Sequence, residues 1–198
     1  KLTLGGFEVE EIIELEENGK KLITLDLSST ANRSDSLSIA GIAREMSTIL
    51  DKPYKVSKYL DKTSNWEKQF FEFLVPSTAK NELSVFLAIS VENLTNIKPP
   101  IWLTNKLISS GLVPQNNLLD YKNFILLETG YPFEFYDLNQ IQSHLNSTDF
   151  DLKLTDKIKN QKFIGTNDIE YELTDSTLLI KANNTPISIA GLIPQKEF

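Results

Sequence analysis

The chain has 198 residues, of which 40% are hydrophobic and 24% charged, a balance typical of a globular protein. The absence of cysteine excludes a disulfide-stapled scaffold, and no apolar run is long enough to span a membrane, so we expect no membrane partner. The net charge of −7 argues against a general nucleic-acid binder and against a DNA partner, while leaving room for a local contact to RNA.

The N-terminal residues predict a β-hairpin. Period-2 alternation of apolar and acidic residues favours a half-buried strand within residues 2–15. ENGKK at 17–21 is typical of a hairpin turn, and residues 22–27 fit a second strand. Six Glu fall within residues 8–17, and we interpret them as a solvated strand face rather than a metal site.

A helix is predicted next. Apolar residues within 32–50 recur at the spacing of one helical face, Ser34 or Asp35 can cap its N-terminus, and Pro53 follows its end. Residues 55–69 are polar and without a clear period, so they are predicted to form a linker.

The remaining elements mix strands and helices. Strands are predicted at 70–75 and 83–92, and a short helix at 99–111, where Pro stands at the start and Gly at the end. A second helix is predicted within 112–130, ending at Gly130. Short strands follow at 169–173, 178–182 and 187–191. Together these elements predict an α+β fold.

Most catalytic signatures are absent from the sequence. There is no phosphate-binding glycine loop and no nucleophile elbow, and the single histidine, His144, is expected in an exposed polar loop. Trp102 is expected in the core rather than as a binding platform. Arg33 and Arg44 are expected to make structural ion pairs, with Asp35 and Glu45 as nearby candidates and an RNA phosphate as the alternative partner.

Four stretches, in order, resemble the beta subunit of bacterial-type phenylalanine–tRNA ligase. They are LTLGGFEVEEI at 2–12, NRSDSLSIAGIARE at 32–45, PPIWLTNKLISSGLVPQNNLLDYKNFILLETGYPFEFYD at 99–137 and ISIAGLI at 187–193. The second matches the family pattern N-R-x-D-x-L-x-x-x-G-x-A-R-E. The third follows a P-x-W-L start and then N-N-x-x-D-x-x-N-Y-x-x-x-E-x-G-x-P-x-H-A-F-D.

The resemblance implies three parts and a function. Residues 1–54 would be a small, truncated N-terminal α+β module, 55–69 a linker and 70–198 a larger mixed β/α editing module with several β-hairpins. In the family, the editing module hydrolyses tyrosine wrongly attached to the phenylalanine tRNA. It implies that tRNA and the alpha subunit are partners in an α2β2 heterotetramer, and that ATP and Mg are used elsewhere in the ligase, with no cofactor or metal here. Both ends are expected to continue in a longer chain.

Two features imply an organellar origin. ENGKK joins the first two strands directly, where most bacterial members insert an oligonucleotide-binding barrel. Only two of the 20 basic residues are Arg, which fits an AT-rich genome. We therefore expect a plastid-encoded protein of the stroma, with the cytoplasm as the alternative.

The editing pocket carries over residue by residue from the resemblance. The candidates are Lys122, Asn123, Phe124, Pro132, Glu134, Ala190 and Gly191.

Several pocket positions depart from the family. Lys122 replaces Thr, Phe124 replaces Tyr, Glu134 replaces His and Phe135 replaces Ala, while Pro194-Gln195 stands where the family has a Gly pair. A carboxylate only accepts hydrogen bonds, whereas imidazole also donates. The sequence leaves two interpretations open: a working variant pocket, and a degenerate pocket kept for scaffolding or for positioning tRNA.

Structural roles compete with the pocket roles. Lys122 and Glu134 can pair with each other, Asn123 can tie a helix end to a loop, and Ala190-Gly191 can be small because two strands pack closely there. No residue is assigned as catalytic.

Overall fold

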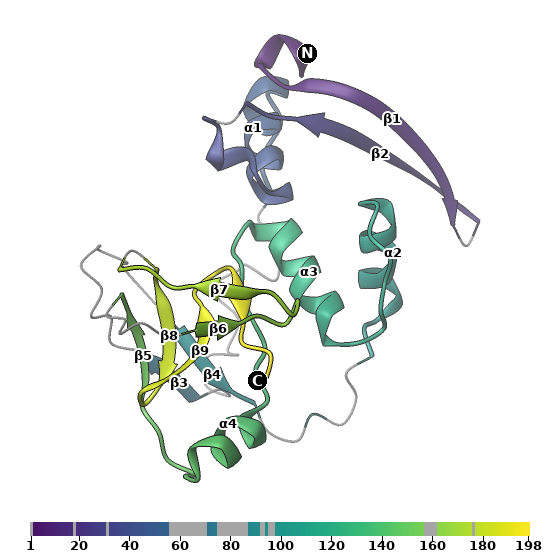
Figure 1. The fold of residues 1–198 in the computed structure, drawn as a ribbon. Helices are drawn as coiled ribbons and strands as arrows, with labels where there is room; N and C mark the ends of the chain where they lie inside the picture. The colour runs from purple at the N-terminus through teal and green to yellow at the C-terminus, as the bar shows by residue number, and fades with distance from the viewer. Residues whose placement is uncertain are drawn as a thin grey trace. The chain divides into compact units, whose positions relative to one another are not determined.

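The computed structural model of the chain describes residues 2–17, 19–30, 32–55, 71–74, 87–91, 94, 98–156, 162–175 and 177–198. It contains helices together with antiparallel hairpins and sheets, which confirms the predicted α+β fold (Figure 1). Two compact units emerge: Lys1–Ser64 with Leu94–Phe133, and Asn65–Asn93 with Glu134–Phe198. The division at residues 1–54, 55–69 and 70–198 stays a prediction, and residues 56–69 of the predicted linker lie outside the described residues.

The first unit combines a long hairpin with three helices. Its elements are η1 (Thr3–Gly5), β1 (Glu8–Glu17), β2 (Lys20–Ser28), η2 (Ser34–Ser36), α1 (Ile39–Leu50), α2 (Ile101–Ser109) and α3 (Leu118–Thr129). The predicted hairpin and the predicted helices are all present. Gly111 and Gly130, which follow α2 and α3, both have φ of 77°, a left-handed backbone that glycine adopts without strain.

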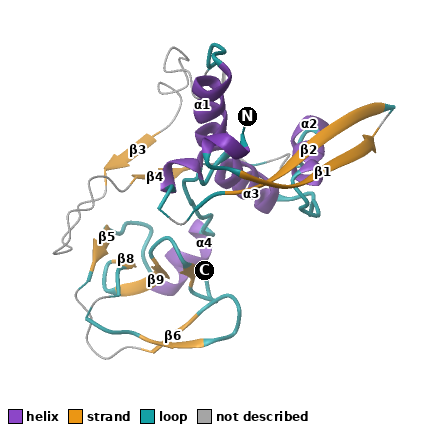
Figure 2. Cartoon of the chain, turned by 90° about the horizontal axis from the view of Figure 1, so that it is seen from above, coloured by secondary structure: helices purple, strands orange, loops and turns teal. Residues whose placement is uncertain are grey.

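The two strands of the hairpin pair antiparallel along their whole length, with a register shift between Val9 and Glu11. Beyond this bulge, Ile12 lies opposite Leu25 and Ile13 opposite Thr24, so these two pairs occupy opposite faces of the ribbon. The Thr24 hydroxyl donates to the Ser109 carbonyl oxygen at 2.9 Å, which ties one face to α2 (Figure 2).

The start of α1 differs from the prediction. Its N-cap is Ser38, whose hydroxyl accepts from the Gly41 N–H at 3.0 Å, while Ser34 and Asp35 lie in η2. The Asp35 carboxylate is instead held by Arg33, with Nε–Oδ1 and Nη2–Oδ2 both at 3.0 Å, which confirms that predicted ion pair. A carboxylate held in this way is not available to cap the helix, so the cap moves to the next suitable side chain.

Arg33 joins several parts of the N-terminal module. Its guanidinium also reaches Glu45 on α1 at 3.3 Å and lies 5.5 Å from the ring centroid of Phe7, which is 1% exposed. The N-R-x-D part of the motif therefore has a structural role here, because one cation organises η2, α1 and the buried ring.

The second unit is mostly β. Its elements are β3 (Phe71–Leu74), β4 (Leu87–Ser90), α4 (Leu138–Leu145), β5 (Leu152–Thr155), β6 (Lys162–Ile164), β7 (Glu170–Glu172), β8 (Leu179–Ala182), β9 (Thr185–Ile189) and β10 (Ile193–Pro194). One sheet has the order β10-β9-β8-β5, and β3 pairs with β4 and β6 with β7, all antiparallel. The predicted strand at 83–92 is described only over Leu87–Ser90 and at Val91, which follows it.

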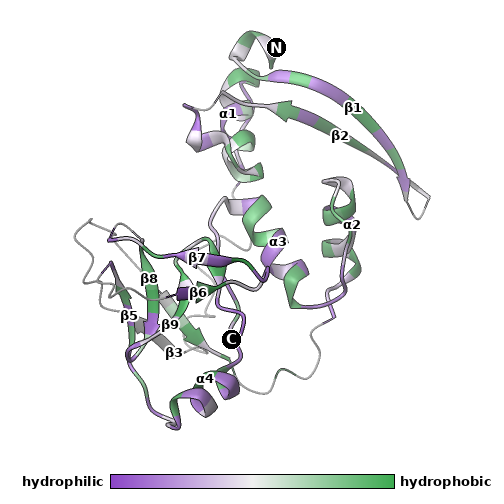
Figure 3. Cartoon of the chain, in the orientation of Figure 1, coloured by the Kyte–Doolittle hydropathy of each residue, from purple (hydrophilic) through white to green (hydrophobic). Residues whose placement is uncertain are grey.

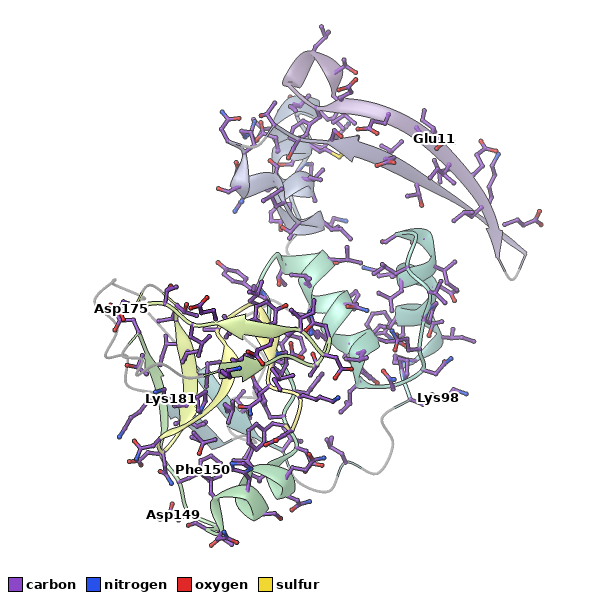
Figure 4. The ribbon with its side chains drawn as sticks, in the orientation of Figure 1. Glu11, Lys98, Asp149, Phe150, Asp175 and Lys181 are labelled. Carbon is purple, nitrogen blue, oxygen red and sulfur yellow. The ribbon has the colours of Figure 1, made fainter. Side chains whose placement is uncertain are left out.

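Each unit has its own apolar cluster. In the first, Leu103 and Leu107 of α2 pack with Phe124 of α3. In the second, buried residues of β5, β8 and β9 pack with Ile141 of α4, and Phe150 joins them (Figure 4). Figure 3 shows the corresponding apolar stretches along β8 and β9, where a continuous run of buried residues is typical of a central strand pair.

Helix α4 was not predicted, and it changes the environment of His144. Asp137 caps α4 by accepting from the Asn139 and Gln140 N–H groups at 2.9 and 3.3 Å. His144 therefore lies in the last turn of a helix and not in a loop, with its ring edge-on to Phe198 at 5.2 Å and Nδ1 3.5 Å from a Glu197 oxygen. In the part of the chain that is described, no helix is long and apolar enough to cross a membrane.

Candidate functional site

The seven candidate residues fall in three segments of the chain. Lys122, Asn123 and Phe124 lie on α3, Pro132 and Glu134 lie in the segment that links α3 to α4, and Ala190 and Gly191 follow β9. The first four belong to the first compact unit and the other three to the second. Their geometry is therefore described within each unit.

The position of α3 is fixed at its N-terminus by the N-N-x-x-D part of the motif. Asn116 has φ of 58°, and the Asn117 side chain accepts from the Leu119 N–H at 2.9 Å as the N-cap. The Asp120 carboxylate is fully buried and accepts from the N–H groups of Gln115 and Asn116 at 2.8 and 2.7 Å. Sequence reasoning assigned no role to Asp120, although an acid in the first turn after two Asn is a recognisable signal.

Phe124 is part of the α2–α3 core. Its ring is 9% exposed, receives the edge of Trp102 at 5.4 Å and has the Lys106 ammonium 5.3 Å from its centroid. A cavity of about 140 Å³ beside it is also lined by Lys106 and Leu127. Trp102 was expected in the core, but it is 40% exposed and only partly covered.

Lys122 and Asn123 are both half-buried on α3. Asn123 lies in the middle of the helix, five residues after Leu118, and the alternative in which it ties a helix end to a loop stays a prediction. The pairing of Lys122 with Glu134 stays a prediction.

Residues 131–137 link α3 to α4 without forming a helix or strand. Gly130 closes α3 by donating its N–H to the Leu126 carbonyl at 2.8 Å, and Pro132 is exposed. Glu134 is half-buried. Because Asp137 caps α4, the last residue of the motif at 99–137 anchors the segment that carries Glu134.

Tyr136 has an enclosed hydroxyl. Burial raises the pKa of Tyr136 to about 12, and the nearby Glu134 carboxylate adds to the rise, while the Ser188 hydroxyl opposes it. Ser188 donates its own proton to the Ile189 and Ile193 carbonyls, at 3.0 Å each, and the Tyr136 oxygen has no well-aligned hydrogen-bond partner among the described residues. The phenol therefore stays protonated at neutral pH, beside the Glu134 carboxylate.

Ala190 and Gly191 form the turn between β9 and β10. Ala190 donates its N–H to the Leu178 carbonyl at 2.9 Å and packs on the second unit's apolar cluster. Gly191 has φ of 69°, and a β-carbon there would meet no atom within 4 Å. Glycine is thus favoured at 191 by the left-handed backbone, and the alternative of close strand packing is wrong for this residue.

The Pro194-Gln195 pair connects two β-elements. The Pro194 carbonyl accepts from the Thr166 N–H at 3.1 Å, and the Gln195 N–H donates to the Ile187 carbonyl at 2.9 Å. Proline loses no ladder bond by accepting only, so it fits this strand. Within the described ranges, no group of three or more His, Asp or Glu side chains is arranged to hold a metal ion.

Comparison with known proteins identifies similar chains along the whole length. The phenylalanine–tRNA ligase beta subunit, chloroplastic, of Phaeodactylum tricornutum is 49% identical over 197 residues, covering 100% of this chain and 28% of the relative. The chloroplastic subunit of Porphyra purpurea is 31% identical over 200 residues (100% and 27%), and the beta subunit of Streptococcus pneumoniae serotype 4 is 28% identical over 188 residues (95% and 22%).

These similarities confirm the resemblance seen in the four motifs. The chain spans about a quarter of the length of the curated relatives it matches. Residues 82–198, more than half of the chain, match the family described as B3/4 domain. The chain therefore belongs to the B3/4 domain family.

Proposed function

We propose that this chain is part of the beta subunit of a phenylalanine–tRNA ligase, and that its B3/4 domain is an editing module for phenylalanine tRNA mischarged with tyrosine. The observation that carries the proposal is similarity to such subunits over the whole chain, together with the B3/4 match at 82–198. The names of the algal relatives support a plastid location over the cytoplasm.

The proposed partners follow from the same similarity. They are phenylalanine tRNA and the alpha subunit of an α2β2 ligase. ATP and Mg²⁺ serve the synthetic reaction in other parts of that assembly. A separate hydrolytic site adds discrimination because a pocket that fits phenylalanine rejects the extra hydroxyl of tyrosine only partly by shape.

Glu134 defines what the proposed pocket can do. An ionised carboxylate accepts a hydrogen bond from water or from the ammonium group of the aminoacyl ester, but it donates none to the ester carbonyl. The protonated Tyr136 hydroxyl lies near enough to Glu134 for the carboxylate to raise the phenol's pKa. Because the Tyr136 hydroxyl is enclosed, it does not replace the lost donor. Glu134 therefore provides an acceptor alone, whereas a single imidazole provides both functions.

A second function, a non-catalytic scaffold that positions tRNA and assembles with the alpha subunit, is favoured by the same substitution. Glu134 removes the neutral-pH donor and acceptor that His would supply, and Phe135 adds bulk where the family has Ala. In that case, residues that hold the elements in place, such as Asp120 and Asp137, would matter more than the pocket.

The test is deacylation of tyrosyl-tRNA(Phe) by the assembled ligase, compared with Glu134→His, Glu134→Gln and the control Glu172→Gln at an exposed β7 residue. Editing predicts hydrolysis well above the uncatalysed rate, weakened by Glu134→Gln and unaffected by the control. If the wild type and Glu134→His both hydrolyse tyrosyl-tRNA(Phe) no faster than the uncatalysed reaction, while phenylalanine charging is normal, the scaffold function is correct.

A further inference from the structure

An apolar groove lies on the first unit, and none of the candidate residues named above lines it. Its volume is about 330 Å³, and it is lined by η1, the base of the β1–β2 hairpin and α1. The lining side chains are almost all apolar: Leu2, Thr3, Val9, Ile12, Leu25, Met46 and Leu50.

The groove continues along one face of the hairpin. Ile12 lies opposite Leu25, and Ile23, two residues before Leu25, projects from the same face. Ile12 is 62% exposed and Ile23 is 63% exposed. The opposite face, which carries Thr24, is tied to α2. A two-stranded ribbon with one covered face and one open apolar face is marginally stable by itself, so the open face favours a further contact.

The charge of the hairpin identifies the kind of partner. Residues 8–28 contain six Glu and one Asp against two Lys, a net charge of −5 out of −7 for the whole chain. Glu14 and Glu16 share the open face with Ile12, and Glu11 projects from the neighbouring position of β1 (Figure 4). Lys21 offsets only part of this charge, through its 2.6 Å ion pair with Glu14.

The apolar face and its negative charge together distinguish the possible occupants of the groove. The phosphate backbone of RNA is repelled by an acidic surface. A second copy of this chain would bring two hairpins of net charge −5 together, which like-charge repulsion opposes. A polypeptide that presents apolar side chains flanked by Lys or Arg satisfies both the groove and its acidic borders.

The shape favours a helix as the bound element. Paired strands lie about 4.8 Å apart, and a helix with its side chains is about 10 Å across, so one helix covers a two-stranded face. We propose that the groove and the open face of the β1–β2 hairpin are a docking site for a basic amphipathic helix of a partner polypeptide. This interface is independent of the proposed editing function.

The test uses the chain as it is, with a fluorescein-labelled probe helix of about 18 residues, or five turns, built from Leu and Lys at amphipathic spacing. Binding is followed by fluorescence anisotropy. A scrambled peptide of identical composition has the same charge but no amphipathic face, so it shows how much of the binding depends on charge alone. A Leu/Glu peptide tests whether binding requires positive charge on the helix. An 18-nucleotide RNA and light scattering of the chain alone test the other occupants.

Two variants decide the result. Ile12→Asn with Ile23→Asn removes apolar contact without changing charge, and we expect binding to weaken about tenfold or more. The matched control is Ile169→Asn, at another exposed isoleucine, which is in the second unit and should leave binding unchanged. Glu14→Gln with Glu16→Gln should weaken binding and reduce its salt dependence, and it serves as the second test should the double Asn variant fail to fold.

Several results would overturn the proposal. Equal affinity of the wild type and the double Asn variant, with circular dichroism showing both folded, would mean that the groove takes no part. Equal affinity for the scrambled peptide would reduce the effect to charge alone. Tighter binding of the RNA, or a dimer of the chain that the Asn variant abolishes, would assign the surface to another occupant.

Discussion

Removing the Asp120 carboxylate tests how the α3 segment is held. The side chain is fully buried and accepts two backbone N–H groups, from Gln115 at 2.8 Å and Asn116 at 2.7 Å. Hydrogen bonds to a charged group contribute about 1.5–3 kcal/mol each, and buried N–H groups left without a partner carry a further penalty. We therefore expect Asp120→Ala to lower the free energy of unfolding by about 3–5 kcal/mol. Asp120→Asn keeps one acceptor oxygen, so its free energy of unfolding should lie between those of the wild type and Asp120→Ala.

The assay is urea denaturation followed by circular dichroism, with hydrogen exchange to locate the change. The amides of Gln115 and Asn116 should lose protection in Asp120→Ala before the rest of the first unit does. Asp149→Ala is the matched control, because that residue is exposed. An Asp120→Ala effect no larger than that of Asp149→Ala, with protection intact at Gln115 and Asn116, would refute the reasoning.

Three further predictions concern stability and titration. A β-carbon at Gly41 would lie 2.0 Å from the Asp35 carbonyl oxygen, so Gly41→Ala should destabilise the chain by about 1–3 kcal/mol in thermal unfolding; an unchanged melting temperature would contradict this. Arg33 lowers the pKa of Asp35 below its ordinary 3.8, so the ion pair stabilises the fold above pH 3.8 and this stabilisation is lost as the pH falls through the lowered pKa. Asp35→Asn should therefore reduce the loss of unfolding free energy at acid pH. An unchanged acid dependence would argue against a stabilising Arg33–Asp35 pair. Ultraviolet titration should show one tyrosine ionising near pH 12, and Tyr136→Phe should remove that step without loss of stability, since the enclosed hydroxyl has no well-aligned partner among the described residues.

The elements that were predicted well are those whose local signals are strong. The hairpin and α2 and α3 carry turn or capping residues at both ends, and Gly130 ends α3 as predicted. Helix α4 was not predicted because its eight residues, LNQIQSHL, are largely polar. Its N-cap, Asp137, also directly follows a run of aromatic residues that favours a strand. The cap of α1 was misplaced because Ser34, Asp35 and Ser38 are all good N-caps. In the structure, Arg33 holds the Asp35 carboxylate, Ser34 lies in η2, and the Ser38 hydroxyl accepts from the Gly41 N–H.

The sequence predicted the family of the candidate site better than the physical roles of its residues. Motif order gave the family, which the B3/4 match confirms. The motifs did not show that Phe124 belongs to a helix–helix core, that Gly191 serves a left-handed turn or that the Tyr136 hydroxyl is enclosed. Each of these facts depends on atoms from segments distant in sequence.

The sequence by itself determined the α+β class, the hairpin, the helix ends marked by glycine and the family. These features depend on residue type at short spacing, where periodicity, turn chemistry and motif order act locally. Only the tertiary structure decided which polar groups are buried and what holds them. Asp120 and Arg33 are ordinary charged residues in the sequence, and their roles come from the backbone amides, carboxylates and ring that folding brings within reach. Burial and partner choice depend on long-range packing, which a single sequence does not encode position by position.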